Sequence, residues 1–361
     1  MLDTSSALPS TPDEITPAWL AHALSIEHPG ITVTSLETTR IIWGAATKVM
    51  LEVTYAGPGA DELPRQLCVK AGLDRRLDAV SDDAIHLTEA LFYGDLRHRF
   101  ETSAPRSYYA ATDAEGRTGL IILEDLAAQG AVFVDPGEAL TPDQVADGLT
   151  HQATWHAVTW GATPETLPGV RVGSITRQAA KLFFRQDYWD RHFAQPEVPH
   201  YPDRLDDPEL LKRVFRGLWA HDDARVHCFL HGDAHVGNTY LRAGGGLGFI
   251  DWQCYGLGPW SYDVAYFVSG ALTVADRRAS EIDLLRHYLD VLAAQGGPRL
   301  DFDEAWRDYA NHLVHGLIWT MTPTLMQPIE RTQTMSERHV TAVEDHDAVF
   351  GSGLLGAASA R

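Results

Sequence analysis

The chain has 361 residues, of which 49 are acidic and 29 are basic, so its formal net charge is −20. Hydrophobic residues make up 45% and charged residues 22%, a globular balance that excludes a fully disordered or collagen-like chain. Because so acidic a protein repels phosphate backbones and anionic lipid, we expect neither nucleic acid nor a membrane surface among its partners.

The cysteine content and the start of the chain both indicate a reducing compartment, the cytoplasm. The chain has an odd number of cysteines, Cys68, Cys228 and Cys254, each in or beside an apolar run, so no disulfide framework is expected. The first 14 residues lack the basic start and apolar core of a secretory signal. No apolar run approaches the roughly 18 residues that a membrane span needs. We therefore expect a soluble cytoplasmic protein.

The first part of the chain has the pattern of an antiparallel sheet. Thr16 is a helix cap followed by Pro17 at the first helical position. Apolar residues then alternate over 48–55, a turn signal follows at Gly57-Pro58-Gly59, and 66–70 is a returning strand. This pattern predicts a hairpin with one buried face.

A helix and a further strand follow the hairpin. The segment 82–99 has apolar residues at helical spacing, and Glu89 falls on the same stripe, between Ile85 and Phe92. The apolar run 119–123 is a buried strand that ends abruptly at Glu124-Asp125. These elements predict a lobe of sheet and one helix over residues 1–125.

Residues 126–361 are predominantly helical in pattern. Thr141-Pro142-Asp143-Gln144 has the composition of a capping box. Two short strands are predicted within this part, at 227–230 and 247–250. The fold class is therefore α+β with two lobes. The further helices are expected at 205–222, 263–270, 279–294, 303–320 and 335–350.

The densest polar cluster follows the first of the two short strands. It begins with His231-Gly232-Asp233 and ends at Asn238, and Asp251 follows the second strand. Phosphoryl transfer needs a carboxylate that accepts the proton of the attacking hydroxyl and oxygen ligands for magnesium. Asp233, Asn238 and Asp251 are a set of that kind, although a turn loop with a capping Asn is the structural alternative.

Lys70 and Glu89 strengthen the phosphoryl-transfer interpretation. Lys70 ends an apolar strand, and a carboxylate on the apolar face of the next helix is costly unless it is paired. A strand Lys held by a helix Glu positions a cation against the phosphates of ATP. A purely structural salt bridge is the alternative for this pair.

Taken together, these segments resemble the aminoglycoside phosphotransferase and choline kinase superfamily, which has a bilobal protein-kinase-like fold, and within it the ecdysteroid-kinase-like branch. The resemblance covers about residues 40–270. It rests on Val69-Lys70, Glu89 with Phe92-Tyr93, Leu123-Glu124-Asp125-Leu126, His231-Gly232-Asp233 with Asn238, Ile250-Asp251-Trp252-Gln253 and Tyr262-Asp263-Val264-Ala265-Tyr266.

The resemblance implies a role for each matching residue. Asp233 would be the catalytic base, and Asn238 and Asp251 would bind Mg²⁺. Lys70, held by Glu89, would bind the phosphates of ATP, and backbone groups near Glu124 and Leu126 would meet the adenine ring. Asp263 would brace the catalytic loop. The predicted function is ATP-dependent transfer of a phosphoryl group to a hydroxyl of a small molecule.

Two departures from the protein-kinase pattern matter. The phosphate-covering loop is expected at 42–47 and has one glycine, Gly44, where protein kinases have several. Asp251 is followed by Trp252-Gln253 in place of Phe-Gly, which favours a small-molecule kinase over a protein kinase.

Two other functions are compatible with some of the same residues. His231, Asp233 and His235 have the spacing of metal ligands in a compact loop, which would suit a metal-dependent hydrolase. A nucleotide-binding protein without catalysis is the other alternative, and the complete Lys/Glu/Asp/Asn/Asp set argues against it.

The acceptor cannot be identified from the sequence, but candidate pocket walls can be named. They are aromatic and histidine residues of the second lobe: Tyr188, Trp189, His192, Tyr255, Trp260, His312, His315 and Trp319. A pocket of this kind suits a bulky, partly apolar alcohol at least as well as a polycationic sugar.

Overall fold

The computed structural model describes residues 2–4, 7–43, 46–73, 84–100, 102–174 and 176–357. The chain forms two compact units. The first comprises Met1–Val132 together with Arg242–Gln253, and the second comprises Phe133–Leu241 and Cys254–Arg361. A segment that the expected boundary after residue 125 assigns to the helical lobe is therefore part of the first unit.

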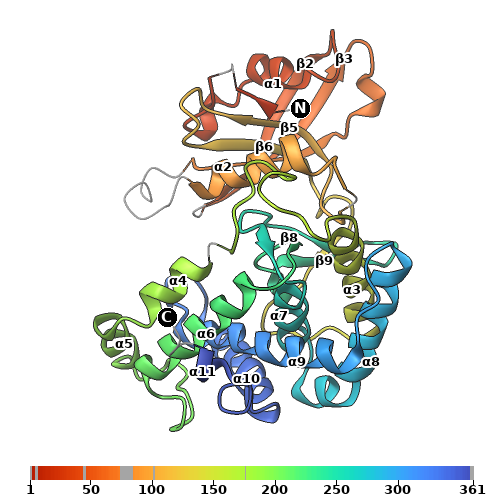
Figure 1. Cartoon of the computed structure of the whole chain (residues 1–361). Coiled ribbons are helices and arrows are strands. Elements are labelled where there is room, and N and C mark those ends of the chain that lie inside the picture. Colours follow the sequence, from red (N-terminus) through yellow and green to blue (C-terminus); the bar gives the residue numbers. More distant parts are fainter. Residues whose placement is uncertain are drawn as a thin grey trace. The chain divides into compact units, whose positions relative to one another are not determined.

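The first unit is built on a six-stranded sheet with the order β1-β5-β6-β4-β3-β2 (Figure 1). Antiparallel pairing joins β2 through β6, and β1 pairs in parallel with β5. The strands are β1 (Leu2–Asp3), β2 (Thr32–Ile42), β3 (Thr47–Ala56), β4 (Gln66–Ala71), β5 (Ser107–Thr112) and β6 (Gly119–Glu124). The predicted hairpin of β3 and β4 is confirmed, with Lys48 opposite Lys70.

Alternation along the strands divides the sheet into two faces. Leu67, Val69 and Ala71 of β4 belong to one hydrophobic core together with Leu20 and Leu24 of α1 (Pro17–Leu24). Because successive side chains of a strand point to opposite faces, Lys70 points to the other face. This places the ammonium group away from the core that α1 covers.

The helix α2 (Ala84–Leu91) packs closely against β6, and a π-helical turn, η4 (Phe92–Leu96), continues it. A Cβ on Gly119 of β6 would lie 2.5 Å from the Ala90 Cβ and 2.6 Å from the His86 carbonyl oxygen, so only glycine permits this approach. The helix predicted over 82–99 is thus confirmed over 84–91. Its expected start, Asp82, lies outside the described residues.

The second unit is mainly helical, and the predicted α+β class, with an antiparallel sheet first and helices after it, is confirmed. Its helices are α3 (Pro142–Val158), α4 (Thr176–Phe183), α5 (Gln186–Phe193), α6 (Pro208–Asp223), α7 (Ser261–Ala271), α8 (Val274–Ala294), α9 (Phe302–His312), α10 (Ile329–Asp345) and α11 (Leu354–Ala357), with 3₁₀ turns η5 (Val236–Asn238) and η6 (Leu313–Met321). Its short strands are β8 (Cys228–Leu230), β9 (Thr239–Leu241) and β11 (Gly256–Gly258); β10 (Leu247–Phe249) belongs to the first unit, and β7 (Val132–Phe133) has one residue in each.

A local sequence signal explains the start of α3. Thr141 accepts a hydrogen bond from the Gln144 N–H and the Gln144 side chain accepts one from the Thr141 N–H, so the predicted capping box is confirmed.

The strand pair predicted from 227–230 and 247–250 does not form, because β8 pairs with β11, with Leu230 opposite Gly256. The second predicted strand, 247–250, is β10 of the first unit.

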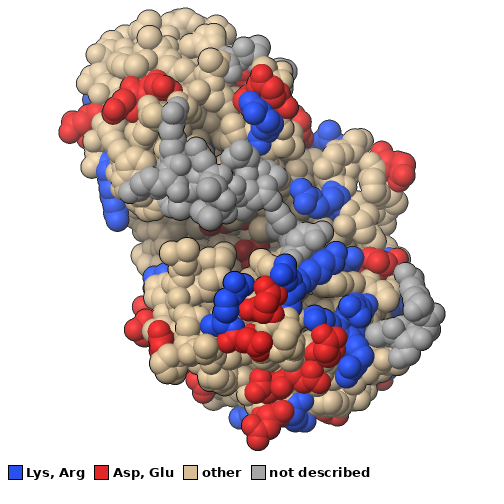
Figure 2. Space-filling view, turned by 90° about the vertical axis from the view of Figure 1, so that its left-hand side faces the viewer, with Lys and Arg blue, Asp and Glu red and all other residues tan. Residues whose placement is uncertain are grey.

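Charged side chains of both signs are interspersed on the face that Figure 2 presents, so the net charge of −20 does not make this face uniformly acidic. Among the described residues, no helix is long and apolar enough to cross a membrane.

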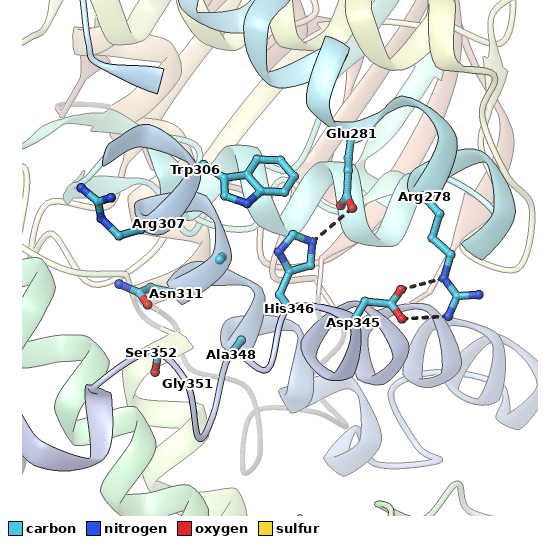
Figure 3. A pocket seen from close by; sticks show the side chains of 11 residues that line it. Arg278, Glu281, Trp306, Arg307, Asn311, Asp345, His346, Ala348, Gly351 and Ser352 are labelled. Carbon is cyan, nitrogen blue, oxygen red and sulfur yellow. Dashed lines mark hydrogen bonds and ion pairs between the residues drawn. The ribbon is translucent and has the colours of Figure 1, made fainter. Parts of the chain in front are cut away.

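A charge network joins α8 and α10 of the second unit. Arg277 of α8 is 1% exposed and pairs with Glu281 at 2.9 Å and with Asp345 of α10. Asp345 also accepts two hydrogen bonds from Arg278, and Glu281 pairs with His346 at 3.1 Å (Figure 3). Removing one partner of such a pair leaves the other charge uncompensated inside the protein.

We therefore expect Arg277→Ala to lower the free energy of unfolding by about 3–5 kcal/mol. Arg286→Ala, on the same helix, removes an exposed pair with Asp283 and a contact over the Phe302 ring, and it should cost about 1 kcal/mol. Urea unfolding followed by circular dichroism compares the two variants. Equal losses would contradict a structural role for the buried network.

Candidate active site

The first unit brings Lys70, Glu89 and Asp251 together. Lys70 Nζ lies 2.8 Å from Glu89 Oε1 and 2.7 Å from Glu89 Oε2, and it also donates a hydrogen bond to Asp251 Oδ1. The Lys70 and Glu89 side chains are each 4% exposed, and that of Asp251 is 25% exposed. The predicted Lys70–Glu89 pair is therefore present, and an acid 181 positions further along the chain joins it.

Burial and charge oppose each other in this cluster. Burial alone would lower the pKa of Lys70, but the carboxylates of Asp251 and Glu89 outweigh it and raise that pKa well above its usual range. Burial raises the pKa of Glu89, and the Lys70 ammonium opposes this effect. Lys70 is thus a fixed cation, held by one enclosed carboxylate and one that is partly open to solvent.

Asp251 is held in an unusual backbone conformation. Its φ of 60° is in the left-handed region, which a non-glycine residue adopts at a cost of about 1–3 kcal/mol when the surrounding structure enforces it. The packing of the next residue, Trp252, fixes this conformation. The Trp252 ring stacks on Phe92, with 4.4 Å between the ring centroids and an interplanar angle of 2°, and Trp252 Nε1 donates a hydrogen bond to the Phe249 carbonyl oxygen. Phe92 begins the π-helical turn three residues after Glu89, so Trp252 ties the Asp251 loop to the helix that carries Glu89.

The loop His231-Gly232-Asp233 lies in the second unit, directly after β8. The buried carboxylate of Asp263 in α7 accepts hydrogen bonds from the His231 N–H at 2.7 Å and from the Gly232 N–H at 3.0 Å, which confirms the predicted bracing role. A Cβ on Gly232 would lie 2.1 Å from the Cys254 carbonyl oxygen, and its φ is 80°, so this position requires glycine. Ser174 holds the other side by donating to the Gly232 carbonyl oxygen at 3.0 Å.

Asp233 and Asn238 face each other across this loop. Asn238 Nδ2 donates to the Asp233 carbonyl oxygen at 2.9 Å and to Asp233 Oδ2 at 3.2 Å. With the amide nitrogen used in this way, Asn238 Oδ1 accepts no hydrogen bond from the described residues. The pair therefore presents a carboxylate that is 23% exposed and an amide oxygen beside it.

The predicted magnesium ligands fit a hard divalent cation. Asn238 offers its free Oδ1 and Asp251 offers a carboxylate, and oxygen ligands of these two types are those that Mg²⁺ prefers. No group of three or more His, Cys, Asp or Glu side chains within the described part of the chain is arranged to hold a metal ion.

The histidines of the loop have other partners. His231 is fully buried and its Nδ1 accepts the Asp233 N–H at 3.3 Å, while His235 Nδ1 accepts the Gly237 N–H at 3.0 Å. His235 Nε2 lies 3.8 Å from Asp233 Oδ2. Both rings thus shape the loop through its backbone, which gives the metal-hydrolase alternative little support.

The predicted adenine-binding segment follows β6 in the first unit. Both carboxylate oxygens of Glu124 are occupied, by the Arg106 N–H and by Gln129 Nε2. The Leu126 carbonyl oxygen accepts hydrogen bonds from Gln129 and Ala131. Its N–H donates to no described residue, so this N–H is the group available to a ring nitrogen.

Two further predicted features have different outcomes. The phosphate-covering loop connects β2 and β3, but Gly44 and Ala45 lie outside the described residues. His312 and His315 are buried, with His312 paired to Asp222 at 2.9 Å and His315 bonded to the Tyr262 hydroxyl at 3.0 Å. These two histidines are therefore buried core residues.

Residues of the site that the sequence pattern missed come from distant segments. Ser174 and the stacking of Trp252 on Phe92 have no local signature, because neither partner is near the other along the chain. Trp319 was one of several candidates, and the structure places its ring 5.2 Å from that of His235, beside the Asp233 loop.

Asp263 should act by positioning the loop. We expect Asp263→Asn to lower kcat and to cost about 2–3 kcal/mol of stability, because an amide cannot accept both N–H groups and its own N–H₂ faces a donor. The KM for nucleotide should stay within about twofold, since the cluster around Lys70 is untouched. Asp283→Asn, at a position 83% exposed, is the control. Steady-state kinetics and thermal unfolding test this, and an unchanged kcat would contradict the positioning role.

Comparison with known proteins places these residues in a family. Similar solved structures are a GDP complex of an aminoglycoside 2′-phosphotransferase (14% identity, 92% of this chain and 98% of that chain, TM-score 0.48), a choline kinase from Streptococcus pneumoniae (14%, 91% and 98%, 0.49) and a macrolide 2′-phosphotransferase from Brachybacterium faecium (16%, 90% and 97%, 0.45). A comparison with curated sequences finds no match. The profile of the phosphotransferase enzyme family matches residues 105–312, which is more than half of the chain and includes Asp233, Asn238 and Asp251. The chain therefore belongs to the phosphotransferase enzyme family.

Proposed function

We propose that this phosphotransferase is an ATP- and Mg²⁺-dependent kinase that phosphorylates a hydroxyl group of a small organic molecule. The observation that carries the proposal is the position of Lys70 Nζ, held between the enclosed Glu89 and the partly exposed Asp251. A fixed ammonium beside an accessible carboxylate suits a phosphate chain with its metal ion.

Each residue of the site has a role in this reaction. Lys70, oriented by Glu89, binds the phosphates, and the Leu126 N–H binds the adenine ring near Glu124. Asn238 Oδ1 and the Asp251 carboxylate would hold Mg²⁺, which would neutralise charge on the phosphates. Asp233 is the catalytic base, and Asn238 Nδ2 fixes the direction of its carboxylate.

In the proposed reaction the γ-phosphoryl group of ATP passes to the acceptor hydroxyl. The acceptor hydroxyl loses its proton to Asp233 while its oxygen bonds to the γ-phosphorus of ATP. The bond between that phosphorus and the β,γ-bridging oxygen breaks, and ADP leaves. The proton then passes from Asp233 to solvent, which restores the carboxylate.

The proposed class of acceptor follows from the side chains around the Asp233 loop. The side chains that pack around the Asp233 loop include His235, Trp319 and Tyr266, whose rings contact one another. These aromatic rings favour a bulky, partly apolar alcohol. The assignment to the ecdysteroid-kinase-like branch stays a prediction.

The test is an assay of ADP formation with ATP and Mg²⁺ against a panel of acceptors that includes apolar alcohols, macrolides, aminoglycosides and choline. We expect acceptor-dependent ADP formation that stops when Mg²⁺ is chelated. Nucleotide binding without turnover on any acceptor would favour the non-catalytic alternative. Stoichiometric zinc, manganese or iron in the purified protein, with no nucleotide binding, would favour the hydrolase.

A further inference from the structure

A pocket of about 390 Å³ lies in the first unit, and its lining includes none of the residues assigned to the nucleotide. It is formed by the segment after α1, by the end of η4 with the turn that follows, and by the start of β5. The polar residues that carry the argument are Glu27, Arg97, His98, Arg106, Ser107 and Tyr108. Two permanent cations thus line one pocket in a chain with a net charge of −20.

Arg97 is the distinctive residue of this pocket. Its N–H donates to the Phe92 carbonyl oxygen at 2.8 Å and so closes the π-helical turn. Its side-chain Nε is enclosed by protein and has no hydrogen-bond partner, and its guanidinium pairs with no carboxylate among the described residues. Arg97 is half-buried, and an enclosed guanidinium nitrogen without a partner is costly, so this side chain gains by pairing with an anion.

Arg106 and its neighbours complete the lining. The Arg106 guanidinium lies over the Tyr108 ring at 4.8 Å from the centroid, which holds it over the pocket wall. Ser107 and Tyr108 carry hydroxyl groups, and His98 adds an imidazole. The lining also includes one carboxylate, Glu27. Its negative charge repels an anion, so the pocket favours an anion of small charge.

The larger pocket of the second unit offers a contrast. It has a volume of about 740 Å³, and its carboxylates Glu281 and Asp345 already pair with His346 and Arg278 (Figure 3). Those charges satisfy each other and hold α8 and α10 together. Within the described part of the chain, Arg97 of the smaller pocket has no carboxylate partner of this kind.

We infer that the pocket at Arg97 binds a small oxyanion with about two negative charges, namely a phosphate group, either free or as a phosphate monoester. A guanidinium presents a planar fork of donors that matches two oxygens of a phosphate. Donors that approach from Arg97, Arg106 and the hydroxyl residues suit a tetrahedral group with oxygens in several directions. Because Arg97 closes the turn that follows Glu89, an anion bound there stabilises the end of the helix that orients Lys70.

The test is calorimetric titration of the full-length protein with inorganic phosphate and with phenyl phosphate, both at constant ionic strength. Arg97→Gln should weaken binding at least tenfold, which corresponds to about 1.4 kcal/mol at 25 °C. Arg99→Gln is the matched control, because Arg99 donates to the Asp95 carbonyl oxygen and does not line the pocket. Its affinity should equal that of the wild type.

The outcomes separate this site from the proposed nucleotide site. Equal phosphate binding by the wild type and Arg97→Gln would overturn the inference, because the anion would then bind elsewhere, such as beside Lys70. No binding by the wild type would also overturn it. If Arg97→Gln fails to fold, Arg106→Gln, at an exposed position, should still weaken binding severalfold. Tighter binding of phenyl phosphate than of inorganic phosphate supports a monoester, and the reverse supports free phosphate.

Discussion

Asp233→Asn should abolish phosphoryl transfer while leaving the binding of ATP within about threefold of the wild type. The amide has nearly the shape of the carboxylate but cannot accept the proton of the acceptor hydroxyl, and general-base catalysis contributes about 10²–10⁴-fold. The Asn238 hydrogen bond to the backbone carbonyl oxygen of residue 233 is retained, so the loop keeps its conformation. A coupled assay of ADP formation measures turnover, and calorimetry measures nucleotide binding.

Asp203→Asn, at an exposed position in the same unit, controls for a change in net charge alone. It should leave both quantities unchanged. Turnover of Asp233→Asn within about twofold of the wild type would remove Asp233 from its catalytic role, whatever the behaviour of the control.

Lys70→Ala should lower kcat/KM for ATP by about 10²–10³-fold, the usual effect of removing one charged or hydrogen-bonding group that stabilises a transition state. The change also leaves the Glu89 and Asp251 carboxylates without the cation between them. We therefore expect a loss of stability of about 3–5 kcal/mol, as for other broken buried pairs. Kinetics with varied ATP and thermal unfolding measure the two effects.

Two variants separate catalysis from stability at this cluster. Glu89→Gln keeps the ammonium beside Asp251 but loosens its position, so it should lower kcat/KM less than Lys70→Ala does. Arg65→Ala removes an exposed cation from the connection between β3 and β4 and should change neither quantity by more than about twofold. The proposed role of Lys70 fails if Lys70→Ala folds and keeps wild-type kinetics.

Local patterns predicted the elements that carry the site. Alternation over 48–55 predicts a buried face, and Val49, Leu51 and Val53 are indeed buried. The position of Glu89 on an apolar stripe predicts a charged partner, because burial of an unpaired carboxylate is too costly, and Lys70 is that partner. Both predictions follow from periods and charges that a short segment contains in full.

Long-range packing was beyond the same reasoning. The return of Arg242–Gln253 to the first unit depends on contacts such as the stacking of Trp252 on Phe92, which are 160 positions apart and leave no local trace. The aromatic stripe of His312 and His315 has the spacing of a pocket wall and of a core helix alike. Pairing with Asp222 and Tyr262, visible only in the fold, assigns it to the core.

The central claim of the proposed function is that a magnesium nucleotide binds at Lys70 and that Asp251 holds its Mg²⁺. Its most direct test is calorimetric titration with ATP, with and without Mg²⁺, of the wild type and Asp251→Asn. The account predicts one ATP per chain, at least tenfold tighter binding with Mg²⁺, and loss of that Mg²⁺ effect in Asp251→Asn. Absence of ATP binding under both conditions, or a Mg²⁺ effect that survives in Asp251→Asn, would contradict it.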